Sequence, residues 1–284
     1  CCTQTPPRSH HTNHSPQFDE QVQRVPLRLR QVHNVMIRPL RIGLLGAMPE
    51  EIGSDLNHLQ ELKSTVFGDL TIHQGTWNSA VKLTLAWSGW GKVSAARAAT
   101  RLLAADPALD LLLFTGVAGA VNPARRQWDV LLANAVVQHD MDASPLFPRF
   151  TLPALNRDRL QPQNAWLNWA QLALQEAHDA KELPGFALPD TGLIATGDQF
   201  IGDSTVLQAL RDALPELQAV EMEGAAVAQV AEQEGIPWLV LRVISDGADD
   251  AAAQSFTDFV QLYEQRAWSL IEALLHRYET APHP

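Results

Sequence analysis

Two acidic motifs in the last third of this chain contain residue types suited to chemistry on a sugar. The segment Val220–Glu223 places two carboxylates, Glu221 and Glu223, at the start of an alanine-rich helical pattern, and the segment Arg242–Asp246 ends an apolar run with Asp246. A carboxylate can accept two charge-assisted hydrogen bonds at once, which suits the neighbouring hydroxyl groups of a ribose. An aspartate at the end of a buried strand can serve as an acid. Together the motifs predict a nucleoside site with an acid that protonates a leaving base.

Three further motifs combine small residues with a polar or aromatic side chain. The glycines of Gly43–Glu51 allow a ligand to approach the backbone closely, and this segment ends in two glutamates. The small residues of Thr115–Val121 form a floor for a compact ligand, and Thr196–Ile201 contains Phe200, which can stack on a purine. Each motif also has a plainer interpretation, namely a helix start, a tight turn or a core aromatic. Their joint position in the fold decides between these interpretations.

Apolar runs alternate with helical patterns from residue 40 onward. The expected strands cover residues 40–45, 71–74, 81–87, 111–115, 130–137, 192–196 and 238–244. The expected helices cover residues 48–59, 93–105, 166–177, 205–214, 225–233 and 259–275. This alternation predicts an α/β fold, a three-layer α/β/α sandwich with a mostly parallel or mixed central sheet. Every motif falls at or near the carboxyl end of an extended segment, where open α/β sheets bind ligands.

Composition narrows the possible partners and compartments. The chain has 284 residues, of which 46% are hydrophobic, and this is ample for a buried core. Its formal net charge of -11 argues against a nucleic-acid partner. Both cysteines, Cys1 and Cys2, stand at the start, so the rest of the chain has no thiol nucleophile, as expected for a cytoplasmic protein. No apolar run approaches the roughly 18 residues of a membrane helix, so we expect no membrane partner.

The first 35 residues differ in composition from the rest. Cys1–Gln23 is rich in proline, histidine, serine, threonine and glutamine, and such a segment cannot bury enough apolar area to offset its ordering entropy. We expect residues 1–35 to be a disordered leader or an upstream extension, and residues 36–284 to be the folded domain, starting at Met36. The alternative is that Cys1 is the lipid-bearing cysteine of a processed lipoprotein.

The motifs together resemble those of the bacterial 5′-methylthioadenosine/S-adenosylhomocysteine nucleosidases, within the purine nucleoside phosphorylase superfamily. The resemblance runs from about residue 42 to residue 275, and its most specific parts are Gly46-Ala47-Met48 with Glu51, Ser88–Val93, Gly197–Ile201, Val220–Glu223 and Arg242–Asp246. It implies a nucleoside phosphorylase-like fold for residues 36–284. It also implies hydrolysis of the N-glycosidic bond of an adenosine thioether, which releases adenine and the thio-ribose without a cofactor.

The resemblance implies two catalytic residues. Glu51 would bind and activate the attacking water, and Asp246 would deliver a proton to adenine N7. Because Asp246 lies on the dry side of the base, we expect it to hold its proton more readily than Glu51. The side chains and backbone expected to bind substrate belong to Met48, Trp90, Val117, Gly119, Phe200, Ile201, Glu221, Met222, Glu223, Arg242, Ser245 and Phe256.

Within that set, the resemblance implies separate roles for the base, the sugar and the 5′ group. Phe200 would stack on adenine, Glu223 would take the ribose hydroxyls, and Met48 and Phe256 would line the pocket for the 5′-alkylthio group. Trp90 stands where the family usually has an isoleucine-like residue. We therefore expect a bulkier wall that disfavours the long homocysteine tail.

The identities of the nucleophile and of the purine base leave alternatives open. The phosphorylases of this superfamily hold phosphate with an arginine and a serine, but the matching positions here are Phe114 and Val117, whose side chains donate no hydrogen bond. We therefore expect water as the nucleophile. The alternatives are a phosphorylase, or a hydrolase of another purine nucleoside such as futalosine. The third alternative is a non-catalytic nucleoside-binding protein, but binding alone would need neither Glu51 nor Asp246.

The expected partners are a small-molecule nucleoside and a second copy of the chain. The resemblance implies a homodimer in which the loop of residues 139–150 lies near the partner's site, with Leu146 or Phe147 at its tip. His73 and His139 are isolated, and no cluster has the spacing of metal ligands, so we expect no metal.

Overall fold

Strands and helices alternate through the residues that the computed structural model describes, 38–53 and 56–282. The strands are β1 (Leu40–Gly46), β2 (Gln60–Phe67), β3 (Leu70–Trp77), β4 (Val81–Trp87), β5 (Leu111–Ala120), β6 (Val130–Gln138), β7 (Asp190–Thr196), β8 (Leu217–Glu221) and β9 (Trp238–Asp246). The helices are α1 (Lys92–Ala105), α2 (Asn164–Asp179), α3 (Ser204–Ala213), α4 (Gly224–Glu234) and α5 (Ala252–Leu275), with 3-10 turns η1 (Pro49–Glu51) and η2 (Tyr278–Thr280). The predicted boundary at residue 36 lies outside the described residues.

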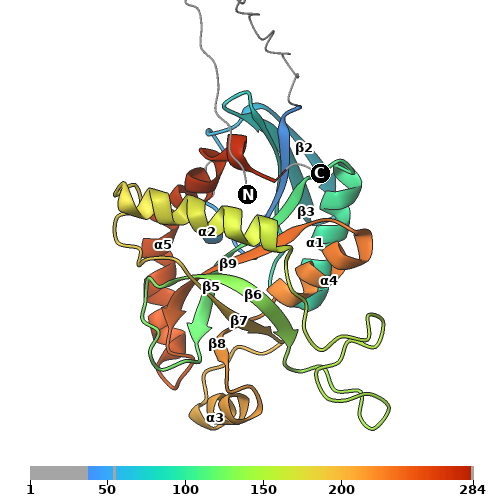
Figure 1. Ribbon diagram of the computed structural model, residues 1–284, viewed down its shortest axis with the longest axis vertical. Helices are drawn as coiled ribbons and strands as arrows, with labels where there is room; N and C mark the ends of the chain where they lie inside the picture. The colour runs from blue at the N-terminus through green and yellow to red at the C-terminus, as the bar shows by residue number, and fades with distance from the viewer. Residues whose placement is uncertain (1–37, 54–55, 283–284) are drawn as a thin grey trace, which may run out of the picture. The chain divides into compact units, whose positions relative to one another are not determined.

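The strands form one mixed sheet whose second half closes on itself. The order is β2-β3-β4-β1-β5-β8-β7-β6-β9, and β5 also pairs with β9. Strands β5, β8, β7, β6 and β9 therefore make a ring, and β1, β4, β3 and β2 extend from it as an open sheet (Figure 1). Pairing is parallel between β1 and β5 and between β5 and β9, but antiparallel between β5 and β8.

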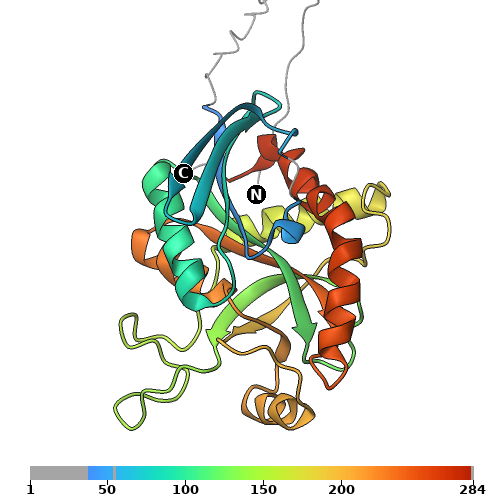
Figure 2. The same cartoon turned by 180° about the vertical axis from the view of Figure 1, so that it is seen from behind.

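Strand β5 shows why helices cover the sheet on both faces. Leu111 and Leu113 belong to an apolar core shared with α2 and α5, whereas Leu112 and Phe114 belong to a second core shared with α1 and α4. A strand that is apolar on both faces must be buried on both. Figure 2 shows α1 and α5 on opposite sides of the strands. The predicted three-layer α/β fold is confirmed.

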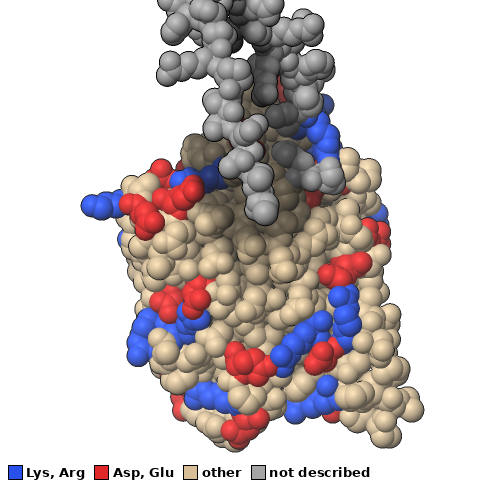
Figure 3. Space-filling model, in the orientation of Figure 1, with Lys and Arg blue, Asp and Glu red and all other residues tan. Residues whose placement is uncertain are grey.

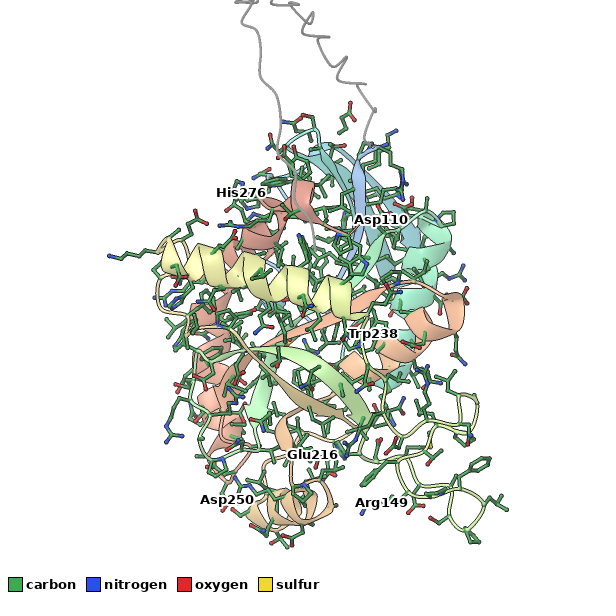
Figure 4. All side chains as sticks on the ribbon, viewed as in Figure 1. Asp110, Arg149, Glu216, Trp238, Asp250 and His276 are labelled. Carbon is green, nitrogen blue, oxygen red and sulfur yellow. The ribbon has the colours of Figure 1, made fainter. Side chains whose placement is uncertain are left out.

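Parallel pairing gathers the carboxyl ends of several strands at one edge. Gly119 of β5 lies opposite Asp246 of β9, and Thr196 of β7 lies opposite Glu221 of β8. Asp110 directly precedes β5, and Figure 4 shows it at the opposite end of the sheet from Asp250, which follows β9. The motifs singled out in the sequence therefore meet at one end of the sheet.

Five differences separate the expected elements from the structure. The helix expected over residues 48–59 is wrong, because only η1 is helical there and Gly53 leaves the helical region with φ of 98°. Strands β2 and β8 were not expected at all. Strand β5 continues five residues beyond the expected Thr115 to Ala120, and α5 begins at Ala252 instead of residue 259.

The described residues contain no helix that could span a membrane. Helices in the described part of the chain are too short or too polar to cross a bilayer. On the face drawn in Figure 3, acidic and basic side chains are interspersed.

Candidate active site

A pocket opens at the carboxyl ends of the strands. Its wall includes thirteen of the fourteen predicted site residues: Met48, Glu51, Trp90, Val117, Gly119, Phe200, Ile201, Glu221, Met222, Glu223, Ser245, Asp246 and Phe256. The fourteenth, Arg242, lies directly behind Glu221. Four further wall residues, Ala47, Ala118, Gln199 and Val220, lie within the predicted motifs but were not among the predicted site residues.

Glu51 is held by backbone from two strands. Its Oε2 accepts hydrogen bonds from the backbone N–H groups of Ala47 (2.5 Å) and Met48 (3.1 Å), which follow β1. Its Oε1 accepts from the Val117 N–H of β5 at 3.0 Å. Burial raises the pKa of Glu51, while the Arg242 charge and these N–H groups act in the opposite direction. The carboxyl group is thus fixed in place and suited to take up a proton.

Arg242 is a fully buried cation among three carboxylates. Its Nη2 donates to Glu221 Oε2 and lies 3.8 Å from Glu223 Oε2, while its Nη1 lies 3.8 Å from Glu51 Oε1. The guanidinium also stacks 4.1 Å from the centroid of the Phe114 ring. Among the described residues, its Nε and Nη1 have no hydrogen-bond partner. Two donors of this buried cation are therefore unpaired behind the pocket wall.

Glu221 and Glu223 both approach Arg242, but their carboxylates differ in what they can still bind. Glu221 accepts hydrogen bonds from Thr196 Oγ1 and Arg242, and from the Glu223 and Gly224 N–H groups. Its oxygens are occupied by protein donors, so it orients Arg242. Glu223 accepts only from the Gly91 N–H, at 2.7 Å, among the hydrogen bonds of the described residues. Glu223 is the carboxylate with capacity left for hydroxyl groups.

The pKa of Glu223 is unusually high for a carboxyl group. Burial, together with the neighbouring Glu221 charge, raises the pKa of Glu223 to about 8, and Arg242 opposes that rise. Near neutral pH the group therefore keeps a proton in the pocket described here. A ligand that donates two hydroxyl hydrogen bonds would favour the ionised form.

Gly116 is a site residue that sequence reasoning overlooked. A Cβ atom at this position would lie closer to Glu51 Oε1 and Arg242 Nη1 than any real contact allows, and the backbone has φ of 151°. Glycine is therefore required for the acid and the cation to approach strand β5. A glycine within a strand that reads as buried is the signal that marks such close approach.

Asp246 stands at the other end of the pocket, beside a bulge. Ala118 pairs with Ile244 and Gly119 pairs with Asp246, so Ser245 is the extra residue in β9. The Ser245 hydroxyl lies 2.6 Å from Asp246 Oδ2 and 3.2 Å from the Ala118 carbonyl oxygen, and the Ala248 N–H donates to Asp246 Oδ1 at 2.8 Å. Bulges re-aim side chains near active sites.

Burial raises the pKa of Asp246, although the Ser245 and Ala248 hydrogen bonds act to lower it. The shift keeps the carboxyl group protonated at higher pH than an exposed aspartate. Asp246 therefore has the protonation behaviour of a general acid.

Three aromatic rings line the open side of the pocket. Trp90 meets Phe256 edge to face with centroids 6.1 Å apart, and Phe256 meets Phe200 in the same way at 5.8 Å. Trp90 is 50% exposed and Phe200 is 38% exposed, so both present ring surface to an incoming ligand. Because Trp90 adjoins Gly91, which holds Glu223, it lies on the Glu223 side of the pocket.

The described residues of the pocket wall offer little to an anionic ligand or a metal ion. The pocket's described wall contains no lysine or arginine side chain. In the described part of the chain, no group of three or more histidine, cysteine, aspartate or glutamate side chains could hold a metal ion. The arrangement instead offers a flat aromatic and apolar cleft with acid groups at both ends.

Comparison with known proteins identifies the family of this site. A family model described as the phosphorylase superfamily matches residues 41–276. The chain belongs to this superfamily. The resemblance inferred from the sequence motifs is confirmed.

Relatives in the phosphorylase superfamily align over nearly their whole lengths. The 5′-methylthioadenosine/S-adenosylhomocysteine nucleosidase of Geobacillus kaustophilus is 33% identical over 237 residues, which cover 83% of this chain and 97% of the relative. The solved structure of the nucleosidase of that name from Colwellia psychrerythraea, in complex with adenine, has a TM-score of 0.79 and 28% identity and covers 87% of this chain and 99% of its own.

A second activity occurs among the superfamily structures. The futalosine hydrolase of Helicobacter pylori has a TM-score of 0.75 and 30% identity, and the match covers 84% of this chain and 97% of that one. Proteins that share this fold therefore include at least two differently named hydrolytic activities.

Proposed function

We propose that this chain hydrolyses the N-glycosidic bond of 5′-methylthioadenosine and S-adenosylhomocysteine, releasing adenine and the thio-ribose. The observation that carries the proposal is a single pocket with two buried acids at opposite ends, Glu51 beside a cation and Asp246 beside a hydroxyl. The names of the aligned relatives support the substrate.

We assign protonation of the leaving base to Asp246, at its end of the pocket. As the bond between C1′ and N9 breaks, electron density gathers on adenine, and a proton from Asp246 to N7 relieves it. Ser245 holds Asp246 in place through their 2.6 Å contact. Phe200 stacks on the base, and the backbone of Ile201 reads its edge.

Attack of water is assigned to the Glu51 end. Glu51 takes a proton from the water as the water oxygen bonds to C1′. Arg242 Nη1 lies 3.8 Å from Glu51 Oε1. The buried carboxylates favour the cationic sugar of the transition state. Glu223 holds the ribose hydroxyls with Met222, while Glu221 orients Arg242, and Val117 and Gly119 form the floor. Proton exchange with solvent returns Glu51 and Asp246 to their starting forms.

Water is favoured over phosphate as the nucleophile by the surroundings of Arg242. Phe114 lies fully buried beneath the guanidinium, and Val117 presents a methyl surface to the pocket. A phosphate dianion there would meet three carboxylates and one cation, so its charge would be poorly compensated. The test is base release from 5′-methylthioadenosine with and without phosphate. A phosphate-independent rate with free methylthioribose supports the proposal, and a sugar 1-phosphate formed only with phosphate overturns it.

We assign selection for the size of the 5′ group to Met48, Trp90 and Phe256. These three side chains carry no charge, so they give the charged end of a homocysteine tail no partner. We therefore propose that the enzyme prefers the compact methylthio group over the homocysteine tail.

Futalosine is the second candidate substrate, because a futalosine hydrolase is among the aligned structures. The same chromatographic assay decides between them. Release of hypoxanthine from futalosine at a higher kcat/KM than release of adenine from 5′-methylthioadenosine would replace the first proposal with the second.

A homodimer is part of the proposal, with the loop of residues 139–150 near the partner's pocket. Leu146 at the tip of this loop is 84% exposed, which leaves a large apolar side chain without cover within one copy of the described chain. The cytoplasm remains the predicted compartment, on the ground that the described residues contain no cysteine.

A further inference from the structure

Lys92, Asp140 and Asp198 form a closed hydrogen-bond ring beside the pocket. Lys92 Nζ donates to Asp140 Oδ1 at 2.6 Å, and the Asp198 N–H donates to Asp140 Oδ2 at 2.9 Å. The Lys92 N–H donates to Asp198 Oδ1 at 2.7 Å and closes the ring. The described wall of the pocket contains none of the three, so they can act on a ligand only through other residues.

The hydrogen-bond ring joins three segments that are far apart in the sequence. Lys92 begins α1, Asp140 follows β6, and Asp198 follows β7. Burial would raise the pKa of Asp140, but the Lys92 ammonium and the Asp198 N–H outweigh it and hold that pKa below its usual value. Asp140 is therefore ionised near neutral pH, and hydrogen bonds to ionised groups are stronger than those between neutral ones.

Asp198 supplies the cap that α1 lacks. The N-cap residue of α1 is Gly91, which offers no side-chain hydrogen bond, and the first turn contains no acidic residue. The first N–H groups of a helix have no partner within it and attract negative charge. The Asp198 carboxylate accepts one of these N–H groups from outside the helix. The segment after β7 is thereby fastened to the start of α1.

The fastened segments contain residues that line the pocket. Asp198 stands two residues before Phe200, whose ring faces the pocket. Lys92 follows Gly91, and the Gly91 N–H donates to Glu223 Oε1 at 2.7 Å. The hydrogen-bond ring therefore connects the segment of the stacking aromatic to the donor that holds a buried carboxyl group.

We propose that the hydrogen-bond ring is a positioning device, which holds Phe200 and the Gly91 N–H on Glu223 at the spacing that a nucleoside requires. Its three members act through these neighbours and do not contact the substrate. The inference rests on the proposed function for what Phe200 and Glu223 bind, whereas the ring itself stands on the contacts alone.

The two aspartates differ in how many oxygens the ring uses. Asp198 accepts the Lys92 N–H through Oδ1 alone, whereas Asp140 accepts through both of its oxygens. Asparagine keeps one oxygen and replaces the other with an NH2 group, which cannot accept a hydrogen bond. The ring should therefore survive Asp198→Asn and open in Asp140→Asn. An effect of charge alone would make these two variants equal.

The kinetic test measures base release from 5′-methylthioadenosine. Asp198→Ala and Asp140→Asn should each raise KM about tenfold and lower kcat less than about threefold, because contacts to the base and ribose are made in the bound substrate as well as in the transition state. Asp198→Asn should stay within about twofold of wild type in both constants. The double variant Asp198→Ala/Asp140→Asn should lose little more than either single one, since both open the same ring.

Asp203→Ala is the matched control. Asp203 caps α3 by accepting the Thr205 and Val206 N–H groups, so the variant loses a helix cap outside the hydrogen-bond ring. It should lower Tm and leave KM unchanged. Its fall in Tm sets the scale for the fall expected in Asp198→Ala.

Amide hydrogen exchange, followed by NMR without any ligand, is a readout that does not depend on turnover. Asp140 accepts from neither the Gly91 N–H nor the Lys92 N–H. Opening the ring in Asp140→Asn should nevertheless speed exchange at both by about tenfold, because the segments then open separately. Asp203→Ala should leave both exchange rates unchanged.

The outcomes separate the hydrogen-bond ring from the proposed function. Faster exchange in Asp140→Asn supports the ring even if wild type releases no base, and that absence of release would overturn only the proposed function. Unchanged exchange, or an active wild type with unchanged KM in Asp198→Ala and Asp140→Asn, would overturn the positioning role. Equal losses in Asp198→Asn and Asp140→Asn would do the same, since charge then explains both. A raised KM in Asp203→Ala, or a ring variant that unfolds, would also overturn it, because general loss of stability then accounts for the effect.

Discussion

Asp246 is the residue on which departure of the base depends in the proposed reaction. Asparagine cannot supply a proton, so we expect Asp246→Asn to lower kcat by about 10²- to 10⁴-fold, the usual contribution of a general acid. Because burial raises the pKa of Asp246, the wild-type rate should fall as pH rises through that raised pKa, where the acid form is lost. Base-release rates between about pH 5 and pH 9 check both points. Asp250→Asn, an exposed aspartate four residues along, is the control, and an active Asp246→Asn variant would remove the acid from the mechanism.

The raised pKa of Glu223 makes the stability of the folded protein depend on pH. Its pKa is about 8 in the folded protein against an ordinary value of 4.5. Between these values the unfolded chain has released the proton and the folded chain keeps it, so the contribution of Glu223 to stability is full below about pH 4.5, falls as pH rises towards 8, and is constant above that. We expect the Tm of Glu223→Gln to fall less than that of wild type over this interval.

Thermal unfolding across the pH series measures this effect. The variant should retain some slope, since burial also raises the pKa values of Glu51 and Asp246. Glu61→Gln, an exposed change on β2, should follow wild type. Parallel Tm curves for Glu223→Gln and wild type would show that Glu223 releases its proton at the ordinary pH.

Trp90 is expected to set the preference for the 5′ group. Trp90→Ala opens the wall next to Phe256, so the ratio of kcat/KM for S-adenosylhomocysteine to that for 5′-methylthioadenosine should rise by about tenfold, which corresponds to a difference of about 1.4 kcal/mol. Side-by-side kinetics with the two substrates measure the ratio. Comparable wild-type efficiency on both substrates would contradict the expectation.

At the scale of elements, the close approach of Glu51 and Arg242 to β5 depends on one glycine. Gly116→Ala would push both groups away from the strand, so we expect a loss of kcat of about 100-fold, typical of a misplaced catalytic group. Gly192→Ala, in β7 outside the pocket, crowds the side chains of Gln218 and Leu131 but no acid or cation, and is the control for packing strain alone. Circular dichroism confirms that each variant is folded. Normal activity of a folded Gly116→Ala variant would show that the acid can shift without cost.

The sequence predicted the elements that have a clear period and missed those that do not. Strand β5 was recognised by its apolar start, but its second half consists of small residues that only pairing with β9 reveals as strand. Strand β2 has an exposed residue at almost every position, so it has no alternation, and tertiary pairing with β3 makes it a strand. The expected helix over residues 48–59 failed because Glu51 turns back to accept backbone N–H groups and Gly53 ends the turn.

The predicted site residues came together because parallel strands deliver their carboxyl ends to one edge. What the sequence did not indicate was the backbone support around them, namely the Gly91 N–H on Glu223, the hydroxyl of Thr196 on Glu221 and the space at Gly116. Such contacts depend on which atoms the fold brings near, and residue type alone does not specify them.

At the scale of the whole molecule, assembly is the remaining prediction. We expect Leu146→Asp to weaken the homodimer, because burying an aspartate in an apolar contact is costly, and to shift the chain to monomer at micromolar concentration. Sedimentation velocity gives the mass, and Leu172→Asp, an equally drastic change of an exposed leucine on α2, is the control. A wild-type monomer at that concentration would rule out the dimer.

The exposed ring of Trp90 also gives the molecule an optical reporter. The chain has eight tryptophans, all within the described residues, and Trp90 is the one with half of its surface exposed. An occupant of the pocket would cover this indole and remove water from it, so its fluorescence emission would move to shorter wavelength while the seven more buried indoles change little. Ligand affinity can then be read from unlabelled protein, and the signal should vanish in Trp90→Phe.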